Sequence, residues 1–362
     1  MSGVTLFASA QAAIHAAPPP VAQRVGIAIP DATRPFPVTD ALAALLPFVG
    51  PTPRVVVGLG LHRRLLLHER PQSPWPVLEH DPDDVVDLST ADIAAPATLS
   101  RHLADQDLVL ELGVVELHQY AGFSGGHKAL AVGCAGRRTI DFLHGRDLVT
   151  APGVEIGRLE GNPFRAAVDQ LGAHFRGRWC LLWSGAGWLA GEPIATLAAV
   201  AAALDVWQDV PTPAQAAILT VRGTKSRNFY QASRAATYLG LSPRPPLVPG
   251  ATLYLDAPCP EGLGTGDGER AFARVLGAGP APWAHLLDGP APVGGGTQRA
   301  IMLALLLRRH PLVVCGVDDP APFRAVGIDA FRQPATELAP PDALHVPDAF
   351  HRLPRLGVSP PE

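Results

Sequence analysis

Lysine is almost absent from this sequence. Of its 29 basic residues only Lys128 and Lys225 are lysines, whereas proline and glycine, with 39 and 36 residues, are abundant. This composition indicates a bias that replaces lysine by arginine wherever either cation serves. A guanidinium stays protonated and cannot act as a nucleophile, so an amine needed for chemistry cannot be replaced in this way. Each remaining lysine is therefore a candidate for a functional amine.

Cysteine pairs, an excess of one charge and long apolar runs are lacking as well. The four cysteines have no CxxC spacing, which argues against a disulfide framework or a zinc–cysteine site and fits the reducing cytosol. A net charge of −4 with a pI near 6.3 gives no basic surface for nucleic acid or anionic lipid. The N-terminus lacks the basic segment of a signal peptide, and the longest apolar helical stretch, around residues 195–203, is too short to span a bilayer. We expect a cytoplasmic protein with no nucleic-acid or membrane partner.

Length and hydrophobic periodicity predict two α/β domains. With 362 residues, 47% of them apolar, the chain can bury two cores. Short apolar runs alternate with helical periodicity. The expected strands are residues 25–29, 54–57, 108–117, 179–183, 217–221, 252–255 and 312–315. The expected helices are residues 40–46, 163–175, 194–207, 231–239, 268–276 and 297–309, with Thr39 capping the first and Asn162 the second.

This alternation predicts largely parallel sheets. A helix end followed by two prolines, at residues 209–213, favours a boundary between a first domain over residues 1–210 and a second over residues 211–339. The proline-rich tail, residues 340–362, contains a helical stretch at 343–353, and we expect it to pack on the first domain. Ligands in such folds bind beyond the carboxyl ends of strands and between domains, so we expect the active site in an interdomain cleft.

Polar turns follow the first two expected strands. The first turn holds an Asp, a Thr and an Arg between two prolines; Arg34 can pair with a phosphate or carboxylate, and Asp31 can accept from a ribose hydroxyl or orient Arg34. The second turn has two glycines before His62, which let the backbone approach a ligand and place an imidazole there. Taken alone, each is more often structural: a capped turn before a helix, and an ordinary loop histidine.

The third expected strand leads into the densest polar segment of the chain, residues 116–128. His118 is followed by a glycine-rich loop, Ser124, Gly125 and Gly126, whose N–H groups can cradle a phosphate, and then by Lys128. Because an alanine follows Lys128, the segment lacks the spacing of a P-loop.

One more histidine, His144, comes sixteen residues after Lys128. Four histidines and a rare lysine near three successive strand ends are more than packing alone explains. His127, which directly precedes Lys128, is the histidine without an assigned role.

The combined pattern resembles the nickel-dependent lactate racemase family. The family's features are an Asp-x-Thr-Arg-Pro turn, a Gly-x-His-Arg loop, a His-x-x-Ala-Gly-Phe-Ser-Gly-Gly-x-Lys segment, and a His sixteen residues after the Lys. All four occur here in order and with the family's spacing, at residues 31–35, 60–63, 118–128 and 144. The resemblance covers residues 21–150 closely and the second domain loosely.

The resemblance implies a nickel-pincer nucleotide, which is a pyridinium-3-thioamide-5-thiocarboxylate mononucleotide holding Ni²⁺ through two sulfurs and a ring carbon. It implies covalent attachment of the thioamide to Lys128 and places His144 as the fourth nickel ligand. Sulfur ligands with one imidazole suit nickel(II). The residues implied to bind the ribose and phosphate are Asp31, Ala32, Thr33, Arg34, Ser124, Gly125 and Gly126.

By the same resemblance His62 and His118 are the catalytic acid/base pair. A base removes the hydroxyl proton while the C2 hydrogen passes to the cofactor as hydride, leaving a transient 2-keto acid. Two histidines on opposite sides of the substrate let either enantiomer be oxidised and either face be reduced, near the pH at which imidazole titrates. The first domain is thus expected to bind the cofactor and carry out catalysis.

The second domain is expected to supply substrate contacts. Gln231 and Arg234 match a family element in which a cation, often lysine, follows a glutamine by three residues; Arg34 is a further candidate contact. A guanidinium pairs with a carboxylate bidentately but is bulkier and planar. Lactate-like acids, sugar acids and dicarboxylates therefore all remain open as substrates. Lys225 is either a second carboxylate contact or a solvated loop lysine.

The leading prediction is a racemase or epimerase of a small 2-hydroxy acid, with the cofactor-synthesis enzymes as partners. One alternative is a metal-dependent hydrolase that uses His62, His118 and His144 as ligands. It is disfavoured because no carboxylate–histidine spacing such as HExxH occurs. A second alternative is a cofactor-binding protein without turnover, which would not need both His62 and His118.

Overall fold

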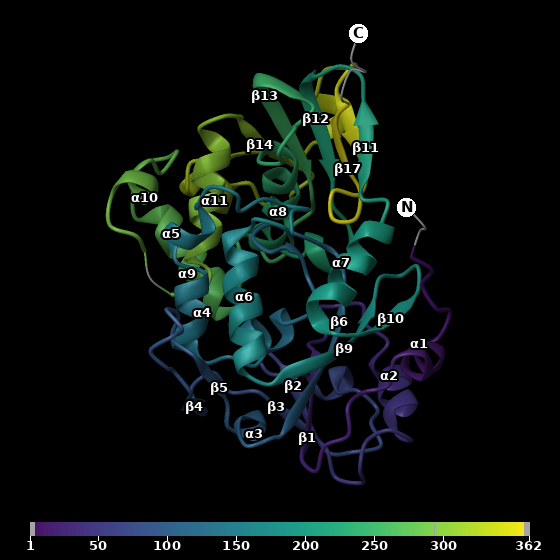
Figure 1. Cartoon of the computed structure of the whole chain (residues 1–362). Helices are drawn as coiled ribbons and strands as arrows, with labels where there is room; N and C mark the ends of the chain where they lie inside the picture. Colours follow the sequence, from purple (N-terminus) through teal and green to yellow (C-terminus); the bar gives the residue numbers. More distant parts are fainter. Residues whose placement is uncertain (1–3, 293, 358–362) are drawn as a thin grey trace. The chain divides into compact units, whose positions relative to one another are not determined.

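The computed structural model describes residues 4–292 and 294–357. The chain divides into two compact units. Unit 1 comprises Met1–His144 and Leu148–Leu204, and unit 2 comprises Gly145–Asp147 and Asp205–Glu362. Each unit has a mostly parallel sheet with helices, which confirms the predicted fold class (Figure 1). The interdomain position of the active site stays a prediction. No helix of the described residues is long and apolar enough to cross a membrane.

Unit 1 is built on a six-stranded sheet in the order β10-β9-β6-β1-β2-β3. Neighbouring strands are parallel except β10, which is antiparallel to β9. The strands are β1 (Val25–Pro30), β2 (Arg54–Gly58), β3 (Val77–Glu79), β6 (Leu108–Val114), β9 (Gly177–Trp183) and β10 (Trp188–Gly191). Two small antiparallel pairs are β4 (Val85–Asp87) with β5 (Thr98–Ser100), and β7 (Leu117–His118) with β8 (Gly122–Phe123).

The two faces of this sheet are covered by different helices, because successive side chains of a strand point to opposite faces. Ile27 and Ile29 of β1 pack in one core with α1 (Ala10–Ala16) and α2 (Val38–Leu45). The other face meets α6 (Pro163–His174), α7 (Pro193–Ala203) and the short π-helix η2 (Ala129–Gly133). Figure 1 shows α1 and α2 together and α6 and α7 apart from them. The remaining helices of this stretch are η1 (Leu67–Glu69), α3 (Arg101–Ala104), α4 (Arg137–Leu143) and α5 (Arg146–Val149).

Strand order places the motif loops together. Strand β1 lies between β2 and β6, so the chain leaves it in one direction for β2 and returns on its other side at β6. At such a switch point the loops after neighbouring strands diverge and leave a crevice for ligands. The loops that follow β1, β2 and β6 carry three of the four predicted motifs, and the fourth, His144, follows α4.

The helix starts were predicted with mixed success. Asn162 caps α6 by accepting a hydrogen bond from the Arg165 N–H, with Pro163 in the first turn, as predicted. The Thr39 cap is wrong. Helix α2 begins at Val38 behind Pro37 and has no side-chain cap, so Thr39 already lies within the first turn, where Asp40 is favourable for the helix dipole.

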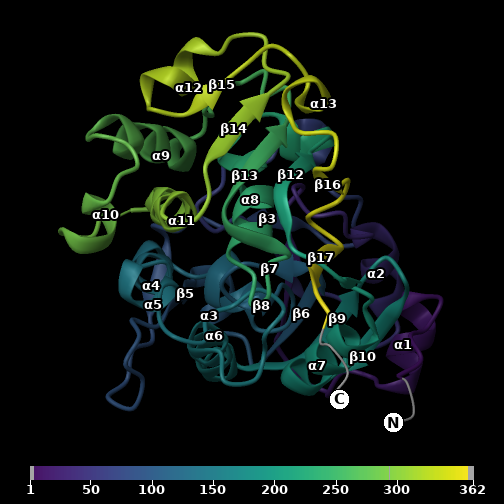
Figure 2. The same ribbon diagram turned by 90° about the horizontal axis from the view of Figure 1, so that it is seen from above.

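Unit 2 is built on a five-stranded parallel sheet in the order β15-β14-β13-β12-β16. Its strands are β12 (Ala214–Thr220), β13 (Leu247–Asp256), β14 (Leu312–Cys315), β15 (Asp329–Ala330) and β16 (Leu344–Val346). Helix α8 (Phe229–Gly240) packs on β13, and α11 (Thr297–Leu307) joins it to α9 (Asp267–Gly277), while α13 (Ala335–Leu338) covers the opposite face (Figure 2). The shorter helices are η3 (Gly223–Ser226), α10 (His285–Asp288) and α12 (Ala321–Ala325).

The C-terminal tail differs from the expectation of a helix packed on the first domain. Residues 343–353 contain β16 and lead into β17 (Leu353–Leu356). Strand β16 pairs with β12, and β17 pairs with β11 (Trp207–Val210), both within unit 2. Pairing along a sheet edge satisfies backbone groups, whereas Pro347 interrupts any helix there. The units accordingly separate at Leu204, before β11, rather than at residue 210; residues 358–362 of the tail lie outside the described residues.

Candidate active site

The turn after β1 orients the histidine after β2. Strands β1 and β2 end level with each other, since Pro30 pairs with Gly58. Asp31 Oδ1 accepts from the N–H and the hydroxyl of Thr33, at 3.0 and 2.6 Å, and Oδ2 accepts from His62 Nδ1 at 2.5 Å. Burial alone raises the pKa of Asp31, but the charge and hydrogen bond of His62 hold it well below its usual range. An ionised carboxylate therefore faces Nδ1 of a half-exposed imidazole.

Two arginines of the motifs brace the same loops. Arg34 Nη1 pairs with Glu116 Oε2 at 3.1 Å, which joins the turn after β1 to the segment after β6. Arg63 donates to both carboxylate oxygens of Glu69 at 2.7 Å and lowers the pKa of Glu69 to about 2. This fork closes the loop that carries His62. Asp31 therefore orients His62 rather than the Arg34 side chain, whose carboxylate partner is Glu116.

His118 sits at the turn of the β7–β8 hairpin. Its Nδ1 accepts from the backbone N–H groups of Tyr120 and Ala121 at 3.3 and 3.1 Å. Because both partners are donors, Nδ1 of His118 carries no hydrogen, and the neutral ring is protonated at Nε2. The ring is buried against Tyr120 and Phe164. His118 is thus a fixed Nε2–H tautomer.

The loop after β8 brings Lys128 to the start of the π-helix η2. The Ser124 hydroxyl donates to the Val114 carbonyl at 2.7 Å and accepts from the Glu116 N–H at 3.0 Å, so it pins the loop to the end of β6. Gly125 and Gly126 have φ of 92° and 56°, which an L side chain rarely adopts. The Ser124 hydroxyl thus has a structural role in the loop, the contact of the loop N–H groups with a phosphate stays a prediction, and Lys128 follows a sharply turned glycine pair.

The π-helix also touches the His62 loop through two glycines. A Cβ on Gly58 would lie 3.0 Å from backbone atoms of Gly133, and the Gly60 N–H donates to the Gly133 carbonyl at 2.8 Å. Short π-helical segments occur frequently at functional sites. This contact joins the His62 loop directly to the segment that begins at Lys128.

His144 caps α4 and presents one defined nitrogen. Its Nδ1 donates to the Ile140 carbonyl at 2.9 Å, so Nδ1 carries the hydrogen and Nε2 holds the lone pair. The ring packs edge-on against Tyr120 and Phe164. Burial, helped by the nearby positive charges of Lys128 and His62, lowers the pKa of His144 to about 4. A neutral imidazole with Nε2 available is the state that binds a metal.

We expect acid to destabilise the folded protein through His144. Its pKa is about 4 when folded and about 6.5 in an unfolded chain, so between these values only the unfolded chain binds the proton. The free energy of unfolding should fall on the order of 3 kcal/mol as the pH drops from 7 to 4. Urea unfolding of wild type and His144→Gln across this range tests it, since the variant should lose that part of the slope. His80→Gln is the positive control because burial also lowers the pKa of His80 to about 4; an unchanged slope in His144→Gln alone contradicts the assignment.

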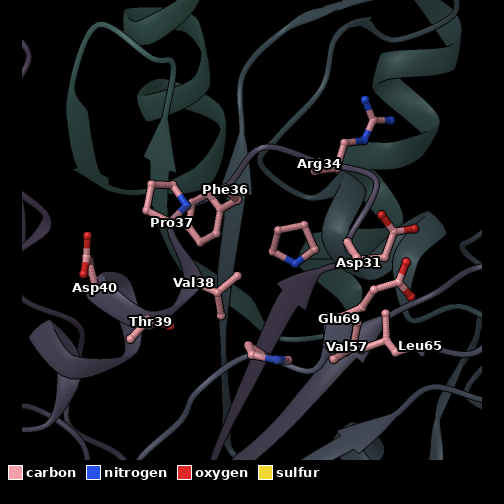
Figure 3. A pocket seen from close by; sticks show the side chains of 13 residues that line it. Asp31, Arg34, Phe36, Pro37, Val38, Thr39, Asp40, Val57, Leu65 and Glu69 are labelled. Carbon is pink, nitrogen blue, oxygen red and sulfur yellow. The ribbon is translucent and has the colours of Figure 1, made fainter. Parts of the chain in front are cut away.

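A cavity of about 330 Å³ lies beside the turn after β1. In Figure 3, Asp31 and Glu69 lie on one side of it, and Thr39 and Asp40 of α2 on the other. Phe36, Val57 and Leu65 give it apolar walls. Its volume is in the range of small-ligand sites. It lies between two loops and a helix that are separate in the sequence, and Asp31, Ala32 and Arg34 of the first motif are among its lining residues.

Two of the predicted substrate contacts, Gln231 and Arg234, lie together on one helix of unit 2. Arg234 Nη1 donates to Gln231 Oε1 at 3.2 Å, and Nη2 donates to the Tyr238 hydroxyl at 2.9 Å. These positions share one face of α8, as residues three and four apart do. Lys225 Nζ lies 5.9 Å from the centre of the Phe350 ring. Gln231 and Tyr238 thus orient Arg234, and the contact of Gln231 and Arg234 with the substrate stays a prediction.

In the part of the chain that the structure describes, no three His, Cys, Asp or Glu side chains are grouped so that they could hold a metal ion. Nδ1 of each site histidine is engaged by the protein, at Asp31, at two backbone N–H groups and at Ile140. With Nδ1 engaged, each of these rings can bind a metal only through Nε2.

The fold and these residues define an α/β protein whose first unit gathers three histidines and a lysine at the carboxyl edge of its sheet. Residues 16–157 match the family described as "Lactate racemase N-terminal domain". This match confirms the resemblance predicted from the four motifs, over residues 16–157 of the chain.

Known proteins similar to this chain agree with that result. The lactate racemase of Lactiplantibacillus plantarum is 29% identical over 147 residues, which cover 36% of this chain and 35% of that protein. The aligned segment therefore spans about a third of the length of the curated relative. The lactate racemase apoprotein of Thermoanaerobacterium thermosaccharolyticum has the same fold, with a TM-score of 0.80 and 18% identity over 98% of this chain and 95% of that one. A Thermotoga maritima protein gives a TM-score of 0.69 and 14% identity, with 95% and 96% covered.

Sequence analysis missed the carboxylates that partner the motif residues. Glu116 was noticed only as part of the dense segment, and the contact between Asp31 and His62 was not foreseen. The available signal was the placement of both residues just after adjacent parallel strands, which end level when their lengths match.

Proposed function

We propose that this protein is an isomerase that racemises or epimerises a 2-hydroxy acid. The observation that carries the proposal is the state of the three histidines within the segment that matches the lactate racemase N-terminal domain. His62 and His144 donate through Nδ1 and keep a lone pair on Nε2, whereas His118 accepts at Nδ1. The state of His62 suits a base, that of His144 suits a metal ligand, and that of His118 suits a hydrogen-bond donor.

The residues fit a lysine-tethered nickel-pincer nucleotide. Lys128 offers an amine in a chain that keeps only two lysines, and His144 offers a single neutral Nε2 for the metal. A ligand set with one imidazole suits a metal whose other donors come from the cofactor. When bound, the cofactor supplies the acceptor that takes the C2 hydrogen as hydride and gives it back. The glycines of the loop and the Asp31–Arg34 turn, which also lines the 330 Å³ cavity, would contact the ribose and phosphate of the nucleotide.

His62 is the better base of the two catalytic histidines. Its Nδ1–H is held by ionised Asp31, so Nε2 can take the hydroxyl proton and the resulting cation is stabilised. For His118 to accept at Nε2, a proton has to move to Nδ1, and the contacts from the Tyr120 and Ala121 N–H groups have to be given up. The two histidines therefore work as an unequal acid/base pair, with His118 chiefly a donor to the substrate oxygen.

Arg234 recognises the substrate carboxylate, with Gln231 and Tyr238 fixing its plane. A guanidinium grips a carboxylate with two parallel N–H groups, which a lysine cannot do. We expect the substrate to be a 2-hydroxy acid that leaves space for a planar, bulky guanidinium beside its carboxylate. Sugar acids and dicarboxylates are among these acids. We place the protein in the cytoplasm, where its four buried free thiols stay reduced and the cofactor-synthesis enzymes act on it.

A substrate panel tests the proposal. Protein produced alongside the cofactor-synthesis enzymes is incubated with single enantiomers of lactate-like, sugar-derived and dicarboxylic 2-hydroxy acids. Chiral chromatography should detect inversion of at least one of them, and protein produced without those enzymes should be folded and inactive. Loaded protein that inverts none of these acids, or unloaded protein that inverts one, contradicts the proposal.

A further inference from the structure

A buried ionic cluster lies beneath the Lys128 loop and has no part in the function described so far. His127 Nδ1 lies 2.8 Å from Glu111 Oε1, and Arg165 Nη2 lies 2.8 Å from Asp169 Oδ1. The side chains of Glu111, His127 and Arg165 are 0%, 2% and 3% exposed. Burying charged groups costs free energy, and apolar replacements of such pairs are often neutral or stabilising. Stability alone therefore does not account for this cluster.

Helix α6 and strand β9 pack closely against the side chains of His127 and Glu111. A Cβ on Gly172 of α6 would lie 2.3 Å from the His127 Cβ, and a Cβ on Gly177 of β9 would lie 2.2 Å from Glu111 Oε1. Both glycines are needed so that the imidazole and the carboxylate fit between α6 and the sheet. The atom met at His127 is next to its backbone, so the packing fixes the chain at residue 127 and not only its ring.

The cluster holds the loop on both sides of Gly126. His127 directly precedes Lys128, and its carbonyl accepts from the N–H groups of Leu130 and Ala131, which begins the π-helix. Arg165 Nη1 donates to the Gly125 carbonyl at 3.4 Å. Adjacent glycines leave a backbone many conformations, so a loop built from Gly125 and Gly126 needs such anchors to hold one of them.

The pKa values of Glu111 and His127 are both raised. Burial raises the pKa of Glu111. For His127 burial acts to lower the pKa, but the charge and hydrogen bond of Glu111 raise it above its usual value. Both shifts favour the protonated forms, and the contact between Nδ1 and Oε1 is a directional hydrogen bond that an apolar pair cannot make.

We propose that Glu111 and His127 are positioning residues that hold the glycine loop so that the Lys128 amine keeps one orientation toward its ligand. His127 occupies the position between the two glycines and the lysine, which the family pattern leaves unspecified. The proposal rests on the proposed function for the identity of that ligand. The positioning of the amine itself can be measured without it.

The test uses the small number of amines in the chain. Unloaded protein is treated with a limiting amount of an acylating reagent such as acetic anhydride, and peptide mass spectrometry gives the labelling of Lys128 relative to Lys225. Glu111→Gln and His127→Gln should raise this ratio about 10-fold, the factor that corresponds to about 1.4 kcal/mol of lost anchoring. His80→Gln, which removes another buried histidine of unit 1, should leave the ratio unchanged.

Loading provides the second measurement. Co-produced with the cofactor-synthesis enzymes, Glu111→Gln and His127→Gln should carry less adduct at Lys128 than wild type does. A ratio unchanged in both variants, or raised equally by His80→Gln, would overturn the positioning role and leave a structural cluster. If His127→Gln does not fold, the labelling ratio of the isosteric variant Glu111→Gln alone tests the positioning role. Wild type without any adduct would sink the proposed function, while the labelling ratio would still decide the role of Glu111 and His127.

Discussion

Lys128→Arg is expected to lose covalent loading completely. Arginine keeps the positive charge and most of the length of the side chain, but its guanidinium stays protonated and offers no nucleophilic nitrogen. Intact mass spectrometry of protein co-produced with the cofactor-synthesis enzymes should show wild type heavier than its sequence by one nucleotide adduct. The variant should have the sequence mass, no retained nickel and no activity.

Lys225→Arg is the matched control for this experiment. It makes the same change at the other lysine, which packs against Phe350 in unit 2, and it should keep the adduct and the nickel. The comparison separates the chemistry of one amine from a general effect of losing lysine. An adduct that survives in Lys128→Arg, or disappears in Lys225→Arg, would show that the wrong lysine has been chosen.

Asp31→Asn is expected to lower kcat about 10⁴-fold in loaded protein, comparable with the loss of the equivalent carboxylate in a serine protease triad. The amide carries no charge to stabilise protonated His62, and its NH₂ group can donate to Nδ1 and so move the ring proton to Nε2. The adduct mass and the nickel content should stay at wild-type values, and kcat measured against pH should change in shape as well as height. Asp40→Asn, in the same cavity but on exposed α2, should retain activity.

This variant also separates two roles of Asp31. The sequence motif places Asp31 among the cofactor-binding residues, whereas the structure puts its carboxylate on His62. A variant that loads normally but turns over slowly supports the positioning of His62. One that fails to load the nucleotide would return Asp31 to cofactor binding.

Most candidate site residues of unit 1 could be brought together from the sequence because they lie in loops that follow strands, whereas His144 ends helix α4. The carboxyl ends of parallel strands meet at one edge, so motifs after β1, β2 and β6 converge whatever the loop details are. This rule and the family spacing were enough to select four candidate residues, which are His62, His118, Lys128 and His144. The strands that were missed, such as β3 and β16, are three residues long and carry too little periodicity to be detected.

The pairings between motifs could not be predicted. Glu111 lies within an apolar strand, and only the packing of α6 on that face of the sheet brings it to His127. The tail forms strands because the open edge beside β12 and the partner β11 are available, which is tertiary information. The tautomers of the three histidines likewise depend on contacts that local sequence does not contain.

One measurement tests the central claim most directly. Loaded protein is incubated in D₂O with a single enantiomer of an accepted 2-hydroxy acid, and chiral chromatography with mass spectrometry follows the product. Hydride transfer to a Lys128-bound cofactor predicts the opposite enantiomer with ordinary hydrogen at C2, because that hydrogen leaves and returns without meeting solvent. Inversion that places deuterium at C2, or inversion undiminished in Lys128→Arg, would contradict it.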